Sequence, residues 1–486
     1  MLLAVSTPSQ DWTRPPTPAG DDLAFAGVAR LSELLGAGAV TPRELVELYL
    51  ERIERLDPQL NAFVSVRADE ALAEADAALG RLRAGESGPL LGVPVAVKDN
   101  VTITDEVTGY GTSANATPAT ADAEVVRRLR AAGAPILGKT AQPELEIWGH
   151  LTESQTHGAT RNPWSPARTT GGSSGGTAAA VAAGLAPVGL ASDGGASIRV
   201  PAAFCGLFGL KPTRGRISTM PQPERWHGLT VLGGIARHVL DAALFDDALR
   251  GPATGDRFTP PAPQISFAEA AQRDPAHLRV AVSLKGTIPG VKVGAAARRA
   301  VEQTAALLDS LGHRVAWRDP NYGVLLADLL PPYLAGVADD AARLEHSERL
   351  ERRSRRMAAV GRRLHGRILR RALSRESKVA ERVNAIFADH DVLLTPVTAA
   401  QPEPVGRWRN AGAARTFNGT SAYVTYTAIW NYLGQPAAAL PAGFDEQGLP
   451  QAVQIVAPAG EETTLLSLAA QLERAQSWTD RRPTVS

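Results

Sequence analysis

Residues 171–180 read GGSSGGTAAA, and residues 192–201 read SDGGASIRVP. Each stretch contains a glycine-rich turn that presents a serine, Ser173 in the first and Ser197 in the second. Glycine lets the backbone approach another group closely, so successive N–H groups can converge on one oxygen beside the Ser197 hydroxyl. The candidate donors to this oxygen are the N–H groups of Gly194, Gly195, Ala196 and Ser197. A nucleophilic hydroxyl next to an oxyanion hole is typical of acyl-transfer chemistry.

A serine nucleophile also needs a base, and neither stretch contains a histidine. Upstream, residues 93–97 read VPVAV and are followed directly by Lys98. This run predicts a buried strand, and burial favours the neutral form of a lysine because it disfavours charge. A neutral lysine is a competent general base. Lys98 is therefore the candidate base.

Helix and strand signals alternate outward from these turns. Thr41-Pro42-Arg43-Glu44 is a capping box with Pro at the first helical position. Helices are expected over residues 41–55, 68–79 (ended by Gly80), 122–132 and 177–184. Strands are expected over residues 93–97, 134–137, 278–282, 314–317 and 392–395, with a loop over 162–166. This alternation predicts the α/β class.

Two segments differ from the rest in composition. Residues 1–22 are rich in Pro and Thr and are expected to be loose, which leaves 23–486 as the folded part. In residues 343–382, Lys and Arg far outnumber Asp and Glu, and apolar residues recur at near-helical spacing. That region is interpreted as amphipathic and helical. Its basic face is either a solvated surface or a site for a membrane or an anionic partner.

The bulk composition excludes several classes of protein. The chain has 486 residues, a net charge of +1 and 44% hydrophobic residues, which is ordinary for a globular protein and gives no sign of nucleic-acid binding. We expect no membrane span, no secretory signal and no metal-ligand cluster. The one cysteine, Cys205, lies in an apolar stretch and is expected to be a buried structural thiol. A lone thiol fits a reducing cytoplasm, the predicted location.

Two familiar motifs also match in part. Residues 133–140 (GAPILGKT) fit the phosphate-loop pattern, but that motif needs a strand before it and a helix after it, and the predicted order here is the reverse. Residues 172–176 (GSSGG) fit a nucleophile elbow with Ser174 as the attacking residue. An elbow requires a strand directly before the turn, where a loop is predicted. Neither motif is favoured.

The longer pattern resembles the amidase-signature family. The resemblance covers residues 92–100, 133–140 and 162–164, the serine region through 213, and residues 434–437 and 448–454. It implies one compact domain with a large mixed sheet and helices on both sides. It also implies a Ser–cis-Ser–Lys triad, in which Ser197 is the nucleophile, Ser173 the bridging serine on a cis peptide bond, and Lys98 the base.

Further positions follow from the same resemblance. Ser174, Asp193 and Arg199 fall on residues that support the site. The substrate loop of the family falls on Trp148, Gly149 and His150, and Gly172 is assigned to substrate binding with them. No cofactor is expected. The expected partner is a small amide-type substrate, and a homodimer is left open.

The chain departs from the glutaminase branch of the family, which serves tRNA-dependent amidotransferases. That branch carries Ser-Leu-Asp-Gln before Gly-Pro where residues 229–234 here read LTVLGG, and Met-Gly-Ser-Ser where residues 148–151 read WGHL. Aromatic residues near the expected pockets favour an uncharged substrate, because burying an unpaired charge is costly; they are Trp148, Trp226, Trp430 and Tyr432. We therefore expect hydrolysis of neutral aryl or medium-chain amides, with esters and carbamates (urethanes) as an extension. Glutamine hydrolysis for an amidotransferase is the alternative.

Overall fold

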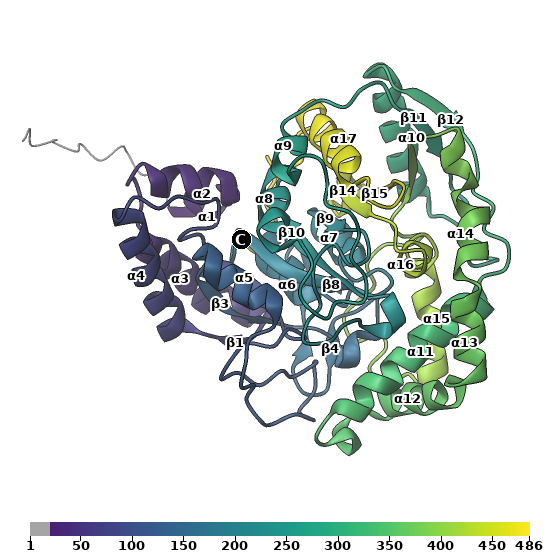
Figure 1. The fold of residues 1–486 in the computed structure, drawn as a ribbon, viewed down its shortest axis with the longest axis horizontal. Helices are drawn as coiled ribbons and strands as arrows, with labels where there is room; N and C mark the ends of the chain where they lie inside the picture. Colours follow the sequence, from purple (N-terminus) through teal and green to yellow (C-terminus); the bar gives the residue numbers. More distant parts are fainter. Residues whose placement is uncertain (1–19) are drawn as a thin grey trace, which may run out of the picture.

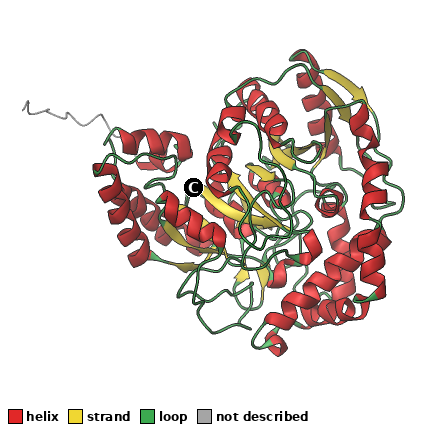
Figure 2. Cartoon of the chain, viewed as in Figure 1, coloured by secondary structure: helices red, strands yellow, loops and turns green. Residues whose placement is uncertain are grey.

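A large mixed β-sheet forms the centre of the molecule, and helices pack on both of its faces (Figures 1 and 2). The computed structural model describes residues 20–486. The strands of this 11-stranded sheet are, in spatial order, β1 (Phe63–Val66), β3 (Ile136–Thr140), β2 (Val95–Lys98), β8 (Val188–Asp193), β10 (Val231–Ala236), β9 (Phe208–Lys211), β14 (Ala437–Phe444), β15 (Pro450–Val456), β13 (Val392–Pro396), β11 (Arg279–Val282) and β12 (Arg314–Trp317). The α/β class expected from the sequence is confirmed.

The helices account for most of the remaining described chain. They are α1 (Gly20–Ala24), α2 (Gly27–Gly36), α3 (Pro42–Leu60), α4 (Ala68–Arg83), α5 (Glu124–Ala132), α6 (Gly175–Ala182), α7 (Arg199–Cys205), α8 (Val239–Leu249), α9 (Phe267–Ala271), α10 (Ala295–Ser310), α11 (Leu326–Arg343), α12 (Arg352–Leu364), α13 (Arg367–Ser374), α14 (Glu376–Asn384), α15 (Ala413–Val424), α16 (Ala428–Tyr432) and α17 (Glu462–Ala475). Short 3₁₀ turns are η1 (Glu144–Glu146), η2 (Trp226–Gly228), η3 (Ser347–Arg349) and η4 (Ala385–Ala388). Of the expected loose segment 1–22, residues 1–19 lie outside the described residues, whereas residues 20–22 begin α1.

The capping box at the start of α3 is present as predicted. The Thr41 hydroxyl accepts from the Glu44 N–H at 3.2 Å, and the Glu44 carboxylate accepts from the Thr41 N–H at 2.7 Å. The helix runs beyond the expected end at residue 55, because Leu56 and Leu60 continue its buried stripe. It ends at Asn61, which adopts the left-handed conformation that often closes helices.

Three local predictions were wrong. Gly80 does not end α4, which continues to Arg83; Gly80 faces open space, so nothing forces a turn there. The strand expected at 134–137 is displaced to β3, because Gly133 first closes α5 in the left-handed conformation. Residues 162–166 are not simply a loop. They include parts of β6 (Arg161–Asn162) and β7 (Ser165–Thr169), which form a hairpin, as do β4 (Glu153–Ser154) and β5 (Gly158–Ala159).

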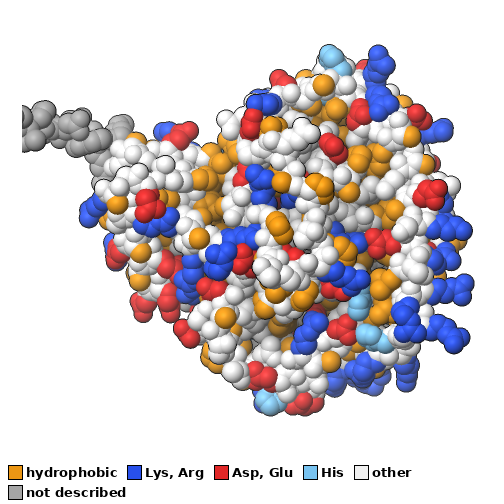
Figure 3. All heavy atoms as spheres, in the orientation of Figure 1, with side chains coloured by type: hydrophobic (Ala, Val, Ile, Leu, Met, Phe, Trp, Pro, Cys, Tyr) orange, Lys and Arg blue, Asp and Glu red, His pale blue; other side chains and the backbone are white. Residues whose placement is uncertain are grey.

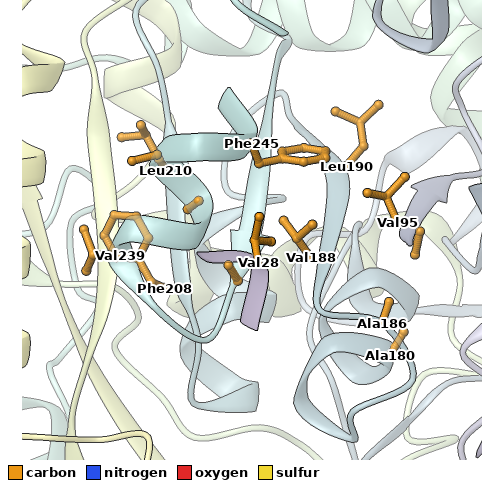
Figure 4. Packing of buried hydrophobic residues seen from close by; sticks show 14 of the residues in the cluster. Val28, Val95, Ala180, Ala186, Val188, Leu190, Phe208, Leu210, Val239 and Phe245 are labelled. Carbon is orange, nitrogen blue, oxygen red and sulfur yellow. The ribbon is translucent and has the colours of Figure 1, made fainter. Parts of the chain in front are cut away.

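The central strands bury both faces, as their side-chain alternation requires. On β14, Ala438 and Leu440 join one apolar core together with α8 and α17, whereas Ala439 joins another with α6 and α7. Figure 4 shows part of the first core, where Val188 and Leu190 on β8 lie near Phe245 of α8. Strands β2 and β8 are parallel neighbours in this sheet, so their carboxyl ends meet at the same edge.

The basic region 343–382 forms α12, α13 and most of α14 rather than one continuous helix. Gly366, at φ 81°, separates α12 from α13 and breaks the expected apolar stripe. Met357 is buried, but Val360 and Ile368 remain 44% and 49% exposed, so only part of the stripe faces inward. Figure 3 shows Lys and Arg side chains gathered along the edge where these helices lie. Within residues 20–486, no helix combines the length and the apolar character that crossing a membrane requires.

Candidate active site

Lys98 is the last residue of β2 and is completely buried. Its Nζ lies 2.7 Å from Ser173 Oγ and 2.8 Å from Ser192 Oγ. Burial is the largest influence on this side chain and lowers the pKa of Lys98 to about 8, although the nearby Glu146 carboxylate acts in the opposite direction. The side chain is therefore far easier to deprotonate than a lysine in water.

Ser173 lies at the tight turn that precedes α6, and the Gly172–Ser173 peptide bond is cis. Gly172 can only be glycine here, because a Cβ would lie 2.2 Å from the Leu151 carbonyl oxygen. The Gly172 N–H donates to the Gly149 carbonyl at 3.2 Å. These contacts press the turn against the segment 149–151 and fix where the Ser173 hydroxyl points. Gly172 thus shapes the turn and does not line the cavity described below.

Ser174 joins the two glycine-rich turns. Its Oγ donates to the Ser192 carbonyl at 3.1 Å, and its N–H donates to the Ser197 carbonyl at 3.2 Å. The side chain is completely buried and does not line the cavity at Ser197. These contacts suit a structural link between the turns and give no support to Ser174 as an attacking residue.

Asp193 and Arg199 hold the loop that carries Ser197. Arg199 Nε and Nη2 donate to the two Asp193 carboxylate oxygens at 2.9 and 3.0 Å, and both side chains are completely buried. Burial alone would raise the pKa of Asp193, but the attraction of Arg199 holds this pKa far below its usual range. The same carboxylate accepts from the Gly195 and Ile198 N–H groups at 3.0 and 3.1 Å. The carboxylate thus fixes the backbone on both sides of Ser197.

These contacts divide the proposed oxyanion donors into two groups. The Gly195 N–H is already engaged by Asp193. In the described part of the chain, the N–H groups of Gly194, Ala196 and Ser197 donate to no protein acceptor. Of the four predicted donors, these three amides therefore have no competing protein acceptor among the described residues, whereas the Gly195 amide has one.

An apolar cavity of about 210 Å³ opens at Ser197. Gly194, Gly195 and Ala196 form one wall, and Trp226, Tyr333 and Phe417 supply aromatic surface. Among the described residues that line it, none is Lys or Arg, and Glu146 is the one carboxylate. A cavity with such walls suits an uncharged group.

The residues predicted to bind substrate occupy different places. Gly149 lines the cavity, but Trp148 and His150 do not and are completely buried behind it. The His150 ring stacks on Tyr423 and meets Trp408 edge to face, and burial lowers the pKa of His150 to about 3, so the ring is neutral. Its Nδ1 lies 3.0 Å from Oγ1 of Thr420, a residue that does line the cavity.

The four aromatic residues expected near the pockets do not all line the cavity. Trp226 lines the cavity, whereas Trp430 and Tyr432 belong to α16 and are buried in the core. Much of the observed wall was not anticipated and comes from Leu326, Leu329, Leu330 and Tyr333 of α11 and from Phe417 and Val424 of α15. The spacing of the four α11 residues follows one helical face, which was the signal available in the sequence.

Two other residues that the sequence analysis considered, Lys139 and Cys205, are buried in the fold and do not line the cavity at Ser197. Lys139, from the phosphate-loop match, is buried in β3, donates to the Val107 carbonyl at 2.8 Å and pairs with Asp99 at 3.1 Å. Cys205 is buried at the end of α7, and burial raises the pKa of its thiol. Within residues 20–486, no group of three or more His, Cys, Asp and Glu side chains is arranged to hold a metal ion.

Comparison with known proteins identifies the family. The Amidase family model matches residues 44–466, so the chain belongs to the amidase-signature family and is a hydrolase of carbon–nitrogen bonds in amides. A Mycobacterium tuberculosis protein named "Putative amidase AmiB2" is 50% identical over 467 residues, which is 96% of this chain and 99% of that protein. The 6-aminohexanoate-cyclic-dimer hydrolase of Paenarthrobacter ureafaciens is 33% identical and aligns with 93% of this chain and 95% of its own length.

Solved structures show the same relationship. A structure of 6-aminohexanoate cyclic dimer hydrolase superposes with a TM-score of 0.89 at 32% identity, covering 95% of this chain and 99% of that one. A bacterial aryl acylamidase of the same family superposes with a TM-score of 0.84 at 25% identity, covering 94% of this chain and 98% of that one. The mixed sheet and its helices are therefore those of the family.

Proposed function

We propose that this amidase hydrolyses neutral, apolar amides, with aryl or medium-chain groups, through an acyl intermediate on Ser197. The observation that carries the proposal is the apolar cavity that opens at Ser197. An anionic substrate group would lose its hydration there without gaining a partner, because none of the described residues that line the cavity is cationic. The one carboxylate in the described lining, Glu146, already accepts from Arg225 and Ser192, so a cationic group would have to compete with them. The printed names of two relatives, a 6-aminohexanoate-cyclic-dimer hydrolase and an aryl acylamidase, agree with such substrates.

The proposed chemistry uses Lys98, Ser173 and Ser197 in series. Lys98 takes a proton from the Ser173 hydroxyl, Ser173 takes one from Ser197, and Ser197 Oγ adds to the amide carbonyl carbon. The 2.7 Å separation of Lys98 Nζ and Ser173 Oγ supports the first transfer. Ser173 then protonates the departing nitrogen, and water releases the acyl group by the same path in reverse.

Backbone N–H groups stabilise the tetrahedral intermediate in this proposal. Gly194, Ala196 and Ser197 supply the donors, since their N–H groups donate to no protein acceptor within residues 20–486. Asp193 holds the loop rigid, so these amides need no reorganisation when the charge develops. Gly195, which was predicted to belong to this group, acts instead by anchoring the loop to Asp193.

The test compares kcat/KM for a neutral anilide, a matching aryl carbamate and glutamine with one enzyme preparation. We expect the anilide to be preferred, with the carbamate as a second substrate because its carbonyl carries the same departing nitrogen. A Ser197→Ala variant controls for contaminating activity. If glutamine is preferred, the apolar-cavity argument fails, and the glutamine-hydrolysing subunit of an amidotransferase becomes the better assignment.

A further inference from the structure

Glu146 is a buried carboxylate at the base of the site and belongs to no motif that defines the triad. Its Oε2 accepts from the Ser192 hydroxyl at 2.7 Å and lies 3.5 Å from Lys98 Nζ. The residue is only 4% exposed, and its backbone adopts φ 63°, a conformation that few non-glycine residues occupy. The protein thus places a negative charge beside Lys98 at some cost to the backbone.

Charged groups on other elements surround this pair. The second Glu146 oxygen, Oε1, accepts from Arg225 Nη2 at 2.6 Å. Arg225 also lies 3.4 Å from Asp340 of α11, and Asp340 accepts from the indole N–H of Trp226 at 2.6 Å. Asp193, at the end of β8, adds a weaker attraction on Lys98. Lys98, Glu146, Arg225 and Asp340 therefore alternate in sign from the base of the site to the cavity wall at Trp226.

We propose that Glu146 is a positioning residue that holds Lys98 against Ser173 and stabilises the ammonium that forms when Lys98 accepts the Ser173 proton. The proposal rests on the role given above to Lys98. Ser192 completes the arrangement, since its hydroxyl lies 2.8 Å from Lys98 Nζ and donates to Glu146. The base is therefore oriented by a third group, as in other activated nucleophiles.

The charge balance supports this role. In the form that acts as a base, Lys98 is neutral and Glu146 carries a negative charge that Arg225 offsets. Burial alone would raise the pKa of Glu146, but attraction by charged neighbours, Arg225 first, holds it at about 2. Proton transfer leaves an ammonium at Lys98 and an oxyanion at the substrate. In a completely buried site that ammonium has no water to solvate it, so the carboxylate 3.5 Å away is its stabilising partner.

The pH dependence distinguishes this role from simple packing. Glu146 raises the pKa of Lys98 against the lowering by burial and by Arg225. Removal of the negative charge in Glu146→Gln must therefore lower that pKa and move the acid limb of kcat/KM to lower pH, by about one unit or more. Plateau kcat should fall at least about tenfold, because the base is weaker and its ammonium is unstabilised.

The experiment measures pH profiles of anilide hydrolysis for Glu146→Gln and for a matched control, Glu144→Gln. Glu144 belongs to the same turn and is also buried, but it accepts from the Glu351 N–H at 2.9 Å. Burial raises the pKa of Glu144 to about 7, so the control also tests whether that carboxyl produces the acid limb. We expect the midpoint to move for Glu146→Gln and to stay at the wild-type value for Glu144→Gln.

A second charge change tests the sign. Arg225 lowers the pKa of Lys98, so Arg225→Gln should move the midpoint to higher pH, opposite to Glu146→Gln. If Glu146→Gln does not fold, Glu146→Asp can replace it. Aspartate keeps the negative charge but holds it farther from Lys98, so the midpoint of the acid limb should move to lower pH by a smaller amount. An unchanged midpoint in a folded Glu146 variant would overturn the proposal. Wild-type activity in Lys98→Ala would instead refute the triad itself, which separates the two failures.

Discussion

Arg199→Met is the substitution whose effect the structure specifies most fully. It removes the cation from a completely buried ion pair and leaves the Asp193 carboxylate without its main partner. Breaking a buried pair by removing one member costs about 3–5 kcal/mol in the free energy of unfolding. Arg199 also donates to the Thr427 carbonyl at 3.0 Å and to Gln454 and Asn431 at 2.8 and 2.6 Å, so the upper end of that range is expected.

The loss should reach the active site as well as the fold. With Arg199 gone, the carboxylate that fixes the Gly195 and Ile198 N–H groups is no longer held, and the loop around Ser197 loosens. Misplacement of a reacting group by about 1 Å can cost roughly a hundredfold in rate, and a fall of that size is expected in kcat.

Urea unfolding and anilide kinetics at pH 7 measure the two effects. Arg216→Met is the matched control, because Arg216, in the loop after β9, forms a similarly buried pair with Glu462 at the start of α17, whose carboxylate accepts from Nε at 2.8 Å. Neither residue lines the cavity at Ser197. Both variants should lose similar stability, but only Arg199→Met should lose kcat. The reasoning is refuted if Arg199→Met keeps wild-type kcat or loses less than about 1 kcal/mol.

The pH dependence of the free energy of unfolding gives a second test of the ion pair between Asp193 and Arg199. The pKa of Asp193 is depressed in the folded state, so its contribution to stability is present above the unfolded pKa of about 4 and is lost as pH falls further. In Arg199→Met that contribution disappears, and the difference in stability between pH 7 and about pH 3, below the unfolded pKa, should become smaller than in the wild-type protein. An unchanged difference would contradict the assignment of the depressed pKa to Arg199.

Four further outcomes are expected. Lys98→Ala should fold but lose most amide turnover, and wild-type kcat/KM should rise with pH through one ionisation near 8, as Lys98 loses its proton; a flat profile would contradict this. Gly172→Ala places a methyl group 2.2 Å from the Leu151 carbonyl oxygen, so the Ser173 turn must shift, and kcat should fall about a hundredfold or more; normal turnover would show that the turn tolerates displacement. Prolonged treatment with a chelator should leave turnover unchanged, whereas a loss restored by added zinc would overturn the metal-free chemistry.

The sequence was informative where the chemistry requires short, local patterns. The glycine-rich turns around Ser173 and Ser197 need particular residues at fixed spacing, and the apolar run before Lys98 predicts a buried strand end. Both features can be recognised without a fold, since they depend on neighbours along the chain. The capping box at Thr41 is of the same kind.

The sequence was uninformative where distant elements meet. Glu146, Arg225 and Asp340 come from three separate segments, and only the tertiary fold places their charges together. The cavity wall from α11 and α15 has the same origin. Trp148 and His150 illustrate the converse error, because proximity to a functional loop in the sequence did not reveal that their side chains turn into the core.

The most direct test of the central claim is covalent labelling by a fluorophosphonate probe followed by intact-mass analysis and peptide mapping. Ser197 lines the apolar cavity, next to amides for which residues 20–486 supply no acceptor, whereas Ser174 is completely buried and links the two turns. If Ser197 is the nucleophile, the probe forms a single adduct on Ser197, and labelling is lost in Ser197→Ala. An adduct on Ser174, or labelling that survives in Ser197→Ala, would contradict that role.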